Sequence, residues 1–290
     1  MNEIGIRPLA SLSEMAEVEE LQKTIWDIPD IEIVPVHALH AIQFNGGALY
    51  GAYDDGRLVG FALGMLGAIS SPERIDQIAA ARLKMYSVMA GVLPEYQDKG
   101  VGYRLKLAQR EFALRVGLRL ITWTYDPLES RNGRFNISKL GCVCQSYLRN
   151  FHGEMAGINA GLPTDRFEVE WWITSNRVEG RVVKERRPLS LDSLLSGGAA
   201  IINPAAWNEN GLPIPPDSAN SPKLLNLLEI PADFQAIKKT DPGLAQAWRQ
   251  HTRELFESMF QQNYLVTDFV FDKGVNGRAR SFYLLASKNS

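Results

Sequence analysis

Two glycines, Gly100 and Gly102, stand where an apolar run ends and a helical pattern begins, and such a turn suits a phosphate. Glycine lets a ligand approach the backbone closely and permits dihedral angles that aim several N–H groups at it. The helix that follows directs the positive end of its dipole to the same place. We therefore predict a phosphate-binding turn, with a strand–helix turn that holds no ligand as the alternative.

The elements around this turn are predicted from the hydrophobic pattern. Residues 86–92 read as a buried strand, apolar residues recur at helical spacing from Leu105 to Leu114, and residues 118–125 read as a second strand. A strand, turn, helix and strand of this length form a right-handed crossover unit with two parallel strands. Neither a Gly-x-Gly-x-x-Gly motif after the first strand nor a Gly-Lys-Ser/Thr motif occurs, which weakens the case for binding of dinucleotides and nucleoside triphosphates.

The turn reads Gln97-Asp98-Lys99-Gly100-Val101-Gly102 and resembles the Gln/Arg-x-x-Gly-x-Gly/Ala pyrophosphate loop of the GNAT (GCN5-related) acyl-CoA N-acyltransferases. The resemblance implies that the backbone of all six residues holds the pyrophosphate of CoA. It also implies an oxyanion donor around Ala90 to Val92, from a splayed or bulged stretch of the preceding strand. The expected fold is α/β, with an α+β mixed sheet and a GNAT-like core over roughly residues 3–175.

The segment that follows the second strand, residues 126–141, matches the family only in part. Asn132 stands where the family has an asparagine near the pantetheine arm of CoA, and the resemblance places Phe135 in the same binding segment. The family's tyrosine, which can protonate the departing thiolate, is missing, because its place falls at about Ile137. Three other tyrosines are substitutes, although a tyrosine more often packs in a core. They are Tyr103, Tyr125 and Tyr147.

Acyl transfer from a thioester to an amine requires a base for the ammonium proton, donors for the thioester oxygen and a proton for the thiolate. Residues 167–173 alternate strongly, so Glu168 and Glu170 share one face of a predicted strand and are candidate bases beside tryptophans. The alternative is the solvated face of an edge strand. Asp126, at the carboxyl end of a predicted central strand, is a third candidate. We select Glu170 or Asp126, with Tyr147, as the residues that manage protons.

These residues predict an enzyme that transfers an acyl group directly from CoA to an amine, without a covalent enzyme intermediate. The resemblance implies acetyl-CoA or a larger acyl-CoA such as succinyl-CoA as the co-substrate. A small-molecule amine is the expected acceptor, with an amino acid left open. The rival interpretation is a non-catalytic acyl-CoA-binding or sensing module, which the missing tyrosine motivates. A third interpretation is an interaction domain that binds no CoA.

Length, composition and charge limit which classes of protein and which partners are compatible with this chain. The chain has 290 residues, enough for one large or two modest domains, with 45% hydrophobic and 22% charged residues. Its net charge of -2 offers no general attraction to nucleic acid or anionic membranes. The longest apolar stretch, residues 58–70, is too short to span a bilayer, and the polar start does not resemble a signal peptide. We expect a cytoplasmic protein that binds neither nucleic acid nor membrane, and a homodimer is one assembly to test.

No metal site is predicted. Cys142 and Cys144 are two residues apart on a predicted strand, so their side chains share a face and are awkwardly placed for a disulfide. We interpret them as free thiols in apolar surroundings, because a catalytic thiolate would need a basic partner such as His152. His37 and His40 share a helix face, but no carboxylate or cysteine pattern completes a metal site.

Outside the central unit, the pattern predicts further elements and a boundary. Ser11 or Ser13 would cap the first helix, and an Asp-Gly turn joins two apolar runs into a hairpin. Prolines and glycines crowd residues 181–222, which we interpret as a loop-rich connection. The predicted strands are residues 3–8, 48–53, 58–64, 224–230, 264–271 and 281–285, and the predicted helices are residues 12–26, 36–44 and 243–262.

This organisation divides the chain into an acyltransferase domain, residues 1–180, the Pro/Gly-rich connection, residues 181–222, and a C-terminal extension, residues 223–290. The strand–helix–strand order of the extension echoes the crossover unit, which would suit a degenerate half-copy of the core. It has no Gly-x-Gly turn between strand and helix, so we expect no second CoA site there. We expect the extension to cover one side of the sheet or to wall the acceptor pocket.

Overall fold

The computed structural model describes residues 3–69, 83–153, 161–184, 188–274 and 277–288. Its internal contacts divide the chain into two compact units. The first unit takes in the described residues up to Trp123 and also Gly161. The second unit consists of Thr124–Gly153 and the described residues from Leu162 onward. The division at residues 180 and 222, which composition suggests, stays a prediction.

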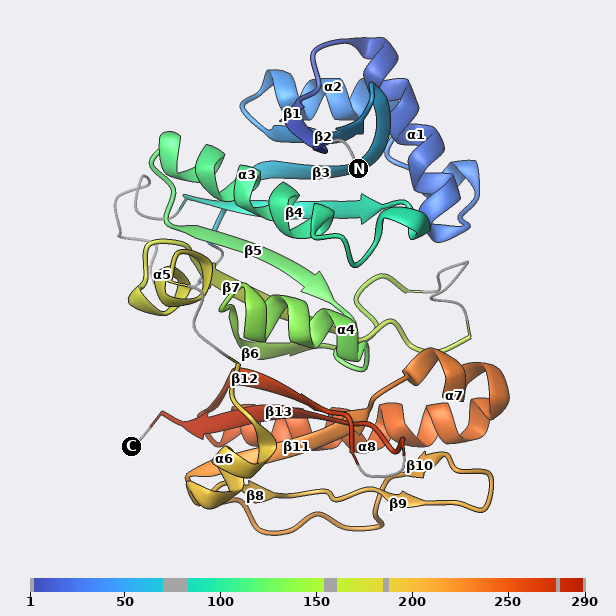
Figure 1. Ribbon diagram of the computed structural model, residues 1–290, viewed down its shortest axis with the longest axis vertical. Coiled ribbons are helices and arrows are strands. Elements are labelled where there is room, and N and C mark those ends of the chain that lie inside the picture. The colour runs from blue at the N-terminus through green and yellow to red at the C-terminus, as the bar shows by residue number, and fades with distance from the viewer. Residues whose placement is uncertain (1–2, 70–82, 154–160, 185–187, 275–276, 289–290) are drawn as a thin grey trace. The chain divides into compact units, whose positions relative to one another are not determined.

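In the first unit, five strands lie side by side in the order in which the chain makes them (Figure 1). The first four are antiparallel neighbours, and the fourth is parallel to the fifth. This combination confirms the expected mixed sheet. The strands are β1 (Gly5–Pro8), β2 (Ala48–Asp54), β3 (Arg57–Ala68), β4 (Leu83–Val92) and β5 (Leu120–Tyr125), and β5 runs on into the second unit.

Three helices pack on the strands of this unit, namely α1 (Leu12–Trp26), α2 (Val36–Phe44) and α3 (Val101–Arg115). The bounds of α1 and α2 are those that the hydrophobic pattern predicts. Ser11 caps α1 in a capping box, since its hydroxyl accepts from the Glu14 N–H and the Glu14 carboxylate accepts from the Ser11 N–H. The predicted hairpin is also confirmed, because β2 pairs with β3 around Asp55 and Gly56, which both have positive φ.

The second unit contains a sheet in the order β7-β6-β12-β13-β11-β8. Its neighbours are antiparallel except for β11 and β8, which are parallel. The strands are β6 (Val143–Leu148), β7 (Arg166–Trp172), β8 (Ala200–Ile201), β11 (Leu225–Pro231), β12 (Tyr264–Asp272) and β13 (Arg280–Ser287). A separate two-stranded sheet pairs β9 (Ala206–Trp207) with β10 (Pro213–Ile214).

The helices of the second unit are mostly short. Two of them lie in the stretch after residue 175 that the pattern left without helices, and Asp233 caps another that the pattern also missed. The helices of the second unit are α4 (Ser130–Gly133) with the π-helix η5 (Arg134–Lys139), α5 (Asn176–Val182), α6 (Leu191–Ser196), α7 (Phe234–Thr240) and α8 (Pro242–Gln261). Of the described helices, none combines the length and the apolar character that a bilayer crossing needs.

The strand–helix–strand order predicted for the extension is present as β11, α8 and β12, but the two strands are not neighbours. Strand β13 lies between them and is antiparallel to both. The extension therefore does not repeat the arrangement of β4, α3 and β5, whose strands pair directly. In the extension, β13 lies between β11 and β12. In the same way, β7 lies between the end of β5 and β6.

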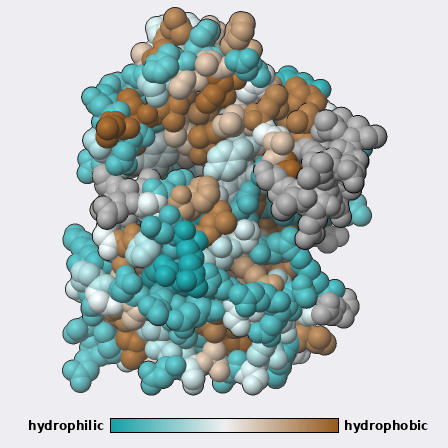
Figure 2. Space-filling model, turned by 180° about the vertical axis from the view of Figure 1, so that it is seen from behind, coloured by the Kyte–Doolittle hydropathy of each residue, from teal (hydrophilic) through white to brown (hydrophobic). Residues whose placement is uncertain are grey.

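Each unit has its own apolar interior. In the first, fully buried side chains come from helix and sheet alike, and include Val18, Leu39, Phe61 and Leu105. Apolar side chains also reach the surface of this unit, as Figure 2 shows from behind, and Ile31 and Phe44 are the most exposed of the large ones. In the second unit, an aromatic cluster surrounds Phe167 of β7. Its members are Tyr125, Tyr147, Phe256, Phe260 and Tyr283.

Candidate functional site

The predicted phosphate turn connects β4 to α3 in the first unit. A single 3-10 turn, Pro94–Tyr96, follows β4, and the Gln97 side-chain amide donates to the Val92 carbonyl at 3.0 Å. Asp98 and Gly100 then adopt positive φ of 59° and 79°. Gly100 occupies the N-cap position of α3, so the sequence change from strand to helix at the two glycines is realised as predicted.

The two positions of the turn are occupied by glycine for different physical reasons. Gly100 needs its left-handed conformation, although a Cβ there would meet nothing within 4 Å. Gly102 is not in the left-handed region, and a Cβ there would meet only Val92 Cγ2, at an ordinary 3.8 Å. Packing therefore leaves room for a side chain at Gly102. A ligand that approaches the backbone explains a glycine at this position better than the fold does.

The N-terminus of α3 is open to an acceptor from outside the helix. The first N–H groups of any helix have no partner within it. Among the described residues, no side chain caps α3, and its first turn carries no acidic residue. Lys99 adds positive charge at the turn, and its ammonium lies 5.0 Å from the centre of the Tyr96 ring. Asp98 balances the charge of Lys99, so it is the backbone N–H groups and the positive end of the helix dipole that make the turn suit an anion.

Strand β4 has an unpaired stretch just before this turn. Its parallel pairing with β5 is confined to Met85 with Ile121 and Tyr86 with Thr122. Beyond Tyr86, the described residues offer no strand partner on that side to the carboxyl half of β4, which includes Ala90 and Val92. Such backbone groups resemble those of a sheet edge, which can pair with an extended ligand.

The irregularity expected around Ala90 to Val92 lies slightly earlier in the strand. On the β3 side, Leu63 pairs with Met89 and Gly64 pairs with Ser87, so Val88 forms a bulge. Ala90 itself keeps a regular partner on that side, as does Val92. The bulge therefore lies near the start of the unpaired stretch, before Ala90.

In the second unit, Asp126 follows β5 and is held in an ion pair. Both of its carboxylate oxygens accept from Arg249 of α8, at 2.8 and 2.5 Å, and one also accepts from the Leu128 N–H. Arg249 is almost completely buried. Burial alone would lower the pKa of its guanidinium, but the charge and hydrogen bonds of Asp126, together with Tyr147 and Asp165, outweigh burial and raise the pKa. Both oxygens of Asp126 are thus bound by Arg249 in this structure.

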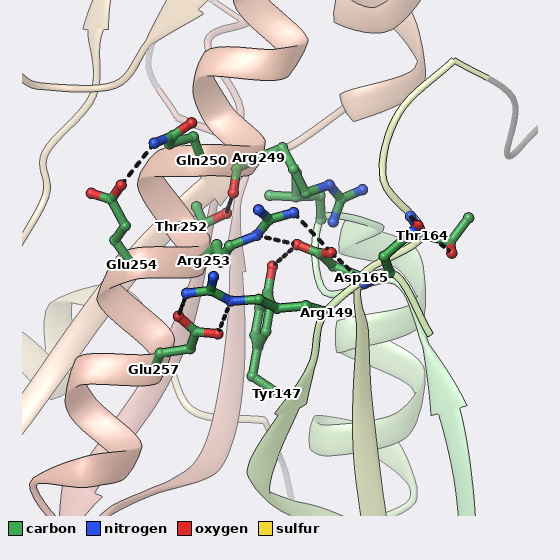
Figure 3. A network of polar contacts seen from close by, with 12 residues as sticks. Tyr147, Arg149, Thr164, Asp165, Arg249, Gln250, Thr252, Arg253, Glu254 and Glu257 are labelled. Carbon is green, nitrogen blue, oxygen red and sulfur yellow. Dashed lines mark hydrogen bonds and ion pairs between the residues drawn. The ribbon is translucent and has the colours of Figure 1, made fainter. Parts of the chain in front are cut away.

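Tyr147, at the end of β6, belongs to a second polar network (Figure 3). Its hydroxyl donates to Asp165 at 2.7 Å, and Arg253 of α8 binds the same carboxylate through two hydrogen bonds. Burial raises the pKa of Tyr147, and the charge of Asp165 raises it further. Burial also acts to raise the pKa of Asp165, but hydrogen bonds from Arg253, the Asn150 backbone and Tyr147 outweigh it, so the pKa is lowered. Tyr147 therefore keeps its proton near neutral pH.

The paired glutamates of β7 lie as the alternating pattern predicts. Phe167, Val169 and Trp171 are buried, while Glu168 and Glu170 are half-buried on the other face. One oxygen of Glu170 accepts from the Trp172 indole N–H at 2.7 Å. Unlike Asp126, Glu170 forms no ion pair with a described residue, so it retains a carboxylate oxygen for a proton.

The segment predicted to meet the pantetheine arm forms α4 and η5. Asn132 is exposed on α4, and Phe135 is half-buried in η5. Ile137, at the family's tyrosine position, is fully buried. Of the substitute tyrosines, Tyr125 is buried against Tyr283, and their hydroxyls lie 3.2 Å apart. Tyr147 is thus better placed than Tyr125 to meet a ligand.

Sequence reasoning missed Glu129, Asp165, Arg249 and Arg253, although the two arginines carry a weak signal in their four-residue spacing on one helix face. Glu129 is half-buried after β5 and accepts from the Gln235 side chain at 2.5 Å. Burial raises its pKa, and the charge of Asp126 adds to the effect.

The two cysteines, Cys142 and Cys144, lie in buried surroundings as free thiols, as the sequence predicts. Burial raises the pKa of the Cys144 thiol. Burial lowers the pKa of His152, with the positive charge of Arg166 as a further cause. Within the described part of the chain, no three His, Cys, Asp or Glu side chains gather closely enough to hold a metal ion.

Comparison with family models and with curated proteins gave no match for this chain. Solved structures do match it over about three fifths of its length. YncA from Salmonella typhimurium, with its cofactor acetyl-CoA, is 18% identical over 60% of this chain and 96% of its own, with a TM-score of 0.46. NAA60 from Arabidopsis thaliana, in complex with a bisubstrate analogue, is 16% identical over 59% and 98%, with a TM-score of 0.48. The ribosomal-protein-S18-alanine N-acetyltransferase from Escherichia coli is 13% identical over 60% and 96%, with a TM-score of 0.45.

Proposed function

We propose that this protein is an acyl-CoA-dependent N-acyltransferase. The observation that carries the proposal is the unpaired carboxyl half of β4, which leads directly into an open glycine turn and a helix N-terminus. The pantetheine arm of CoA contains two amides that can hydrogen-bond to strand backbone, and its pyrophosphate suits the turn. One continuous stretch of chain, from Ser87 to Gly102, thus offers complementary groups to both parts of the molecule.

The reaction we propose is direct attack of an amine on the acyl-CoA thioester. A carbon–nitrogen bond forms, the carbon–sulfur bond breaks, the amine loses a proton and the CoA thiolate gains one. Backbone N–H groups of β4 around Ala90 to Val92 would bind the thioester oxygen. Asn132 and Phe135 would contact the pantetheine arm, as the family resemblance implies.

For the proton transfers, we propose Glu170 as the first base to test, because Asp126 is already paired with Arg249. Tyr147 retains its proton and would supply it to the thiolate, with Asp165 and Arg253 as positioning residues. Asp126 stays a second candidate base. Replacement of Glu170 by Gln should lower kcat at neutral pH with little change in acyl-CoA affinity.

We propose a small-molecule amine as the acceptor, with an amino acid as one class to screen, and acetyl-CoA or succinyl-CoA as the donor. NAA60, which was solved with a bisubstrate analogue, and an S18-alanine N-acetyltransferase are among the similar structures, so a protein N-terminus is the acceptor to compare. We propose the cytoplasm as its location, in keeping with its modest net charge. A homodimer remains the assembly to test.

The test is calorimetric titration of the protein with acetyl-CoA, succinyl-CoA and free CoA. Gly102→Glu should abolish binding, because the added carboxylate fills the place of the pyrophosphate and repels it. The fold should survive, since a Cβ fits there. Gly5→Glu is the matched control, because a Cβ at this exposed strand position would meet nothing within 4 Å.

Absence of binding by the unaltered protein to all three compounds would contradict the proposal. Binding without turnover of any amine would instead support the rival function, a module that binds or senses acyl-CoA. An equal loss of binding in both glutamate variants would show that added charge, and not the turn, is responsible.

A further inference from the structure

A groove in the first unit lies between α3 and the first two strands, and none of the turn residues 97–102 lines it. It has a volume of about 380 Å³ and is open to solvent. This volume is within the range of small-molecule sites, roughly 300–1,000 Å³. Its apolar lining comes from Ile6 and Pro8 of β1 and from Leu107 and Ala108 of α3.

The polar lining places guanidinium groups along the same groove. Arg104, Glu111 and Arg115 lie on one side of α3, at helical spacings of seven and four residues. Arg115 donates to the hydroxyl of Tyr50 at 3.0 Å, and Tyr50 is only 7% exposed. A buried phenol on β2 therefore fixes the orientation of an exposed guanidinium beside the apolar lining.

These guanidinium groups keep most of their hydrogen-bonding capacity. Arginine has five N–H donors, and the bond to Tyr50 accounts for one donor of Arg115 among the described residues. The ion-pair partner of Arg104 is Glu3, at 3.8 Å with a side chain 92% exposed, which is a weak interaction. Glu111 is the one carboxylate in the lining, so the charged side chains of the groove sum to about +1.

We propose that this groove binds a small organic carboxylate with an apolar body. The carboxylate would accept from Arg115, because guanidinium matches carboxylate geometry. Arg104 lies about 16 Å away along α3, by the rise of 1.5 Å per residue, and adds positive charge at the other end of the groove. The apolar body would lie on Leu107 and Ala108, opposite β1. The site uses the side of α3 and none of the turn residues 97–102, so it does not depend on the proposed acyltransferase function.

The test is a titration of the full chain followed by two-dimensional amide NMR, with hexanoate as the probe. Hexan-1-ol and hexylammonium carry the same six-carbon chain with a neutral or a cationic head, and sulfate is an anion without an apolar body. Saturable shifts of the groove amides that occur with hexanoate and with none of the other three compounds support the proposal. Equal binding of hexan-1-ol, sulfate alone binding, or no saturable shift with hexanoate would each overturn it.

Variants separate this site from a diffuse positive surface. Arg115→Ala should weaken hexanoate binding by about tenfold, the effect of losing one charge-assisted hydrogen bond. Tyr50→Phe should weaken it less, because it frees the guanidinium without removing it. Arg119→Ala is the control, since Arg119 is exposed and outside the lining. An Arg115→Ala affinity equal to that of the unaltered chain, or an equal loss in Arg119→Ala, would overturn the proposal.

Discussion

Two carboxylates three residues apart, Asp126 and Glu129, lie in different surroundings after β5. Asp126 keeps its charge and is paired with the buried Arg249, which binds both of its oxygens. Glu129 receives one hydrogen bond, from Gln235, and is not paired with a cation in any described ion pair. Burial and the charge of Asp126 therefore disfavour its ionised form, which raises its pKa. A half-buried carboxyl of this kind is a common feature of functional sites.

Replacement of Glu129 by Gln should stabilise the protein at pH 7. Because the folded pKa lies above the unfolded value of about 4.3, the free energy of unfolding falls as pH rises between the two values. The amide can still accept from Gln235 but does not ionise. Urea unfolding at several pH values should show the variant more stable at pH 7, with the difference vanishing below pH 4. Lower stability of the variant at pH 7 would contradict this account.

The element that organises the polar groups of the second unit is α8. Arg249, Arg253 and Glu257 follow one another at four-residue spacing on one face of the helix (Figure 3). Their partners are Asp126 after β5, Asp165 before β7 and Arg149 after β6. The helix thus binds three connecting segments of the sheet through one stripe of charges. The three ion pairs differ in burial, so their contributions to the free energy of unfolding should differ as well.

Arg253→Met should be far more costly than Arg149→Met. Asp165 is completely buried, so loss of Arg253 leaves a buried carboxylate without its cation, at a cost of about 3–5 kcal/mol. The Arg149 side chain is 60% exposed, and its pair with Glu257 is worth about 1 kcal/mol or less. Urea unfolding of both variants provides the comparison. Similar costs would show that burial does not distinguish the two pairs.

The cap of α1 is a second test at this scale. Ser11→Ala removes the hydroxyl that accepts from the Glu14 N–H, so we expect a loss of about 1 kcal/mol in the free energy of unfolding. Ser196→Ala is the matched control, because Ser196 is exposed at the C-terminal end of α6, far from the N–H groups at the helix start that a serine hydroxyl caps. Thermal and urea unfolding measure both. An equal effect at the two serines would mean that the cap contributes nothing specific.

The elements predicted correctly from sequence are those that local chemistry determines. The capping box at Ser11 sets the start of α1, and the Asp-Gly turn sets the pairing of β2 with β3. Strands β8 to β10 have only two residues each, too few to show alternation. The insertion of β13 between β11 and β12 is a long-range choice that no local pattern encodes.

The same distinction holds for the candidate site. Glycine chemistry at residues 100 and 102 predicts an open turn, and the structure has one. By contrast, the partner of Asp126 lies 123 residues away on α8, so its ion pair could not be read from the sequence around it. The pKa of Tyr147 is likewise raised by burial and by Asp165, neither of which is visible in a six-residue strand.

At the scale of the whole molecule, the residues of β6 and β7 share one unit with the extension. Strand β12 pairs with β6 at Val266 and Cys144. Phe167 of β7 is fully buried among aromatic rings, three of which belong to the extension. These are Phe256, Phe260 and Tyr283. The interior of this unit is therefore built from both sides of the predicted boundary at residue 222.

A chain truncated after Pro222 should consequently lose the structure of β6 and β7. Removal of the three rings resembles several large-to-small core substitutions at about 3–5 kcal/mol each, which together match the whole stability of a typical domain, about 5–15 kcal/mol. Hydrogen exchange read by mass spectrometry should show loss of amide protection in Val143–Leu148 and Arg166–Trp172. A chain ending at Ser287 is the control. If both strands stay protected after truncation, residues 223–290 are a separable extension, as composition predicts, and the aromatic cluster contributes less than its burial indicates.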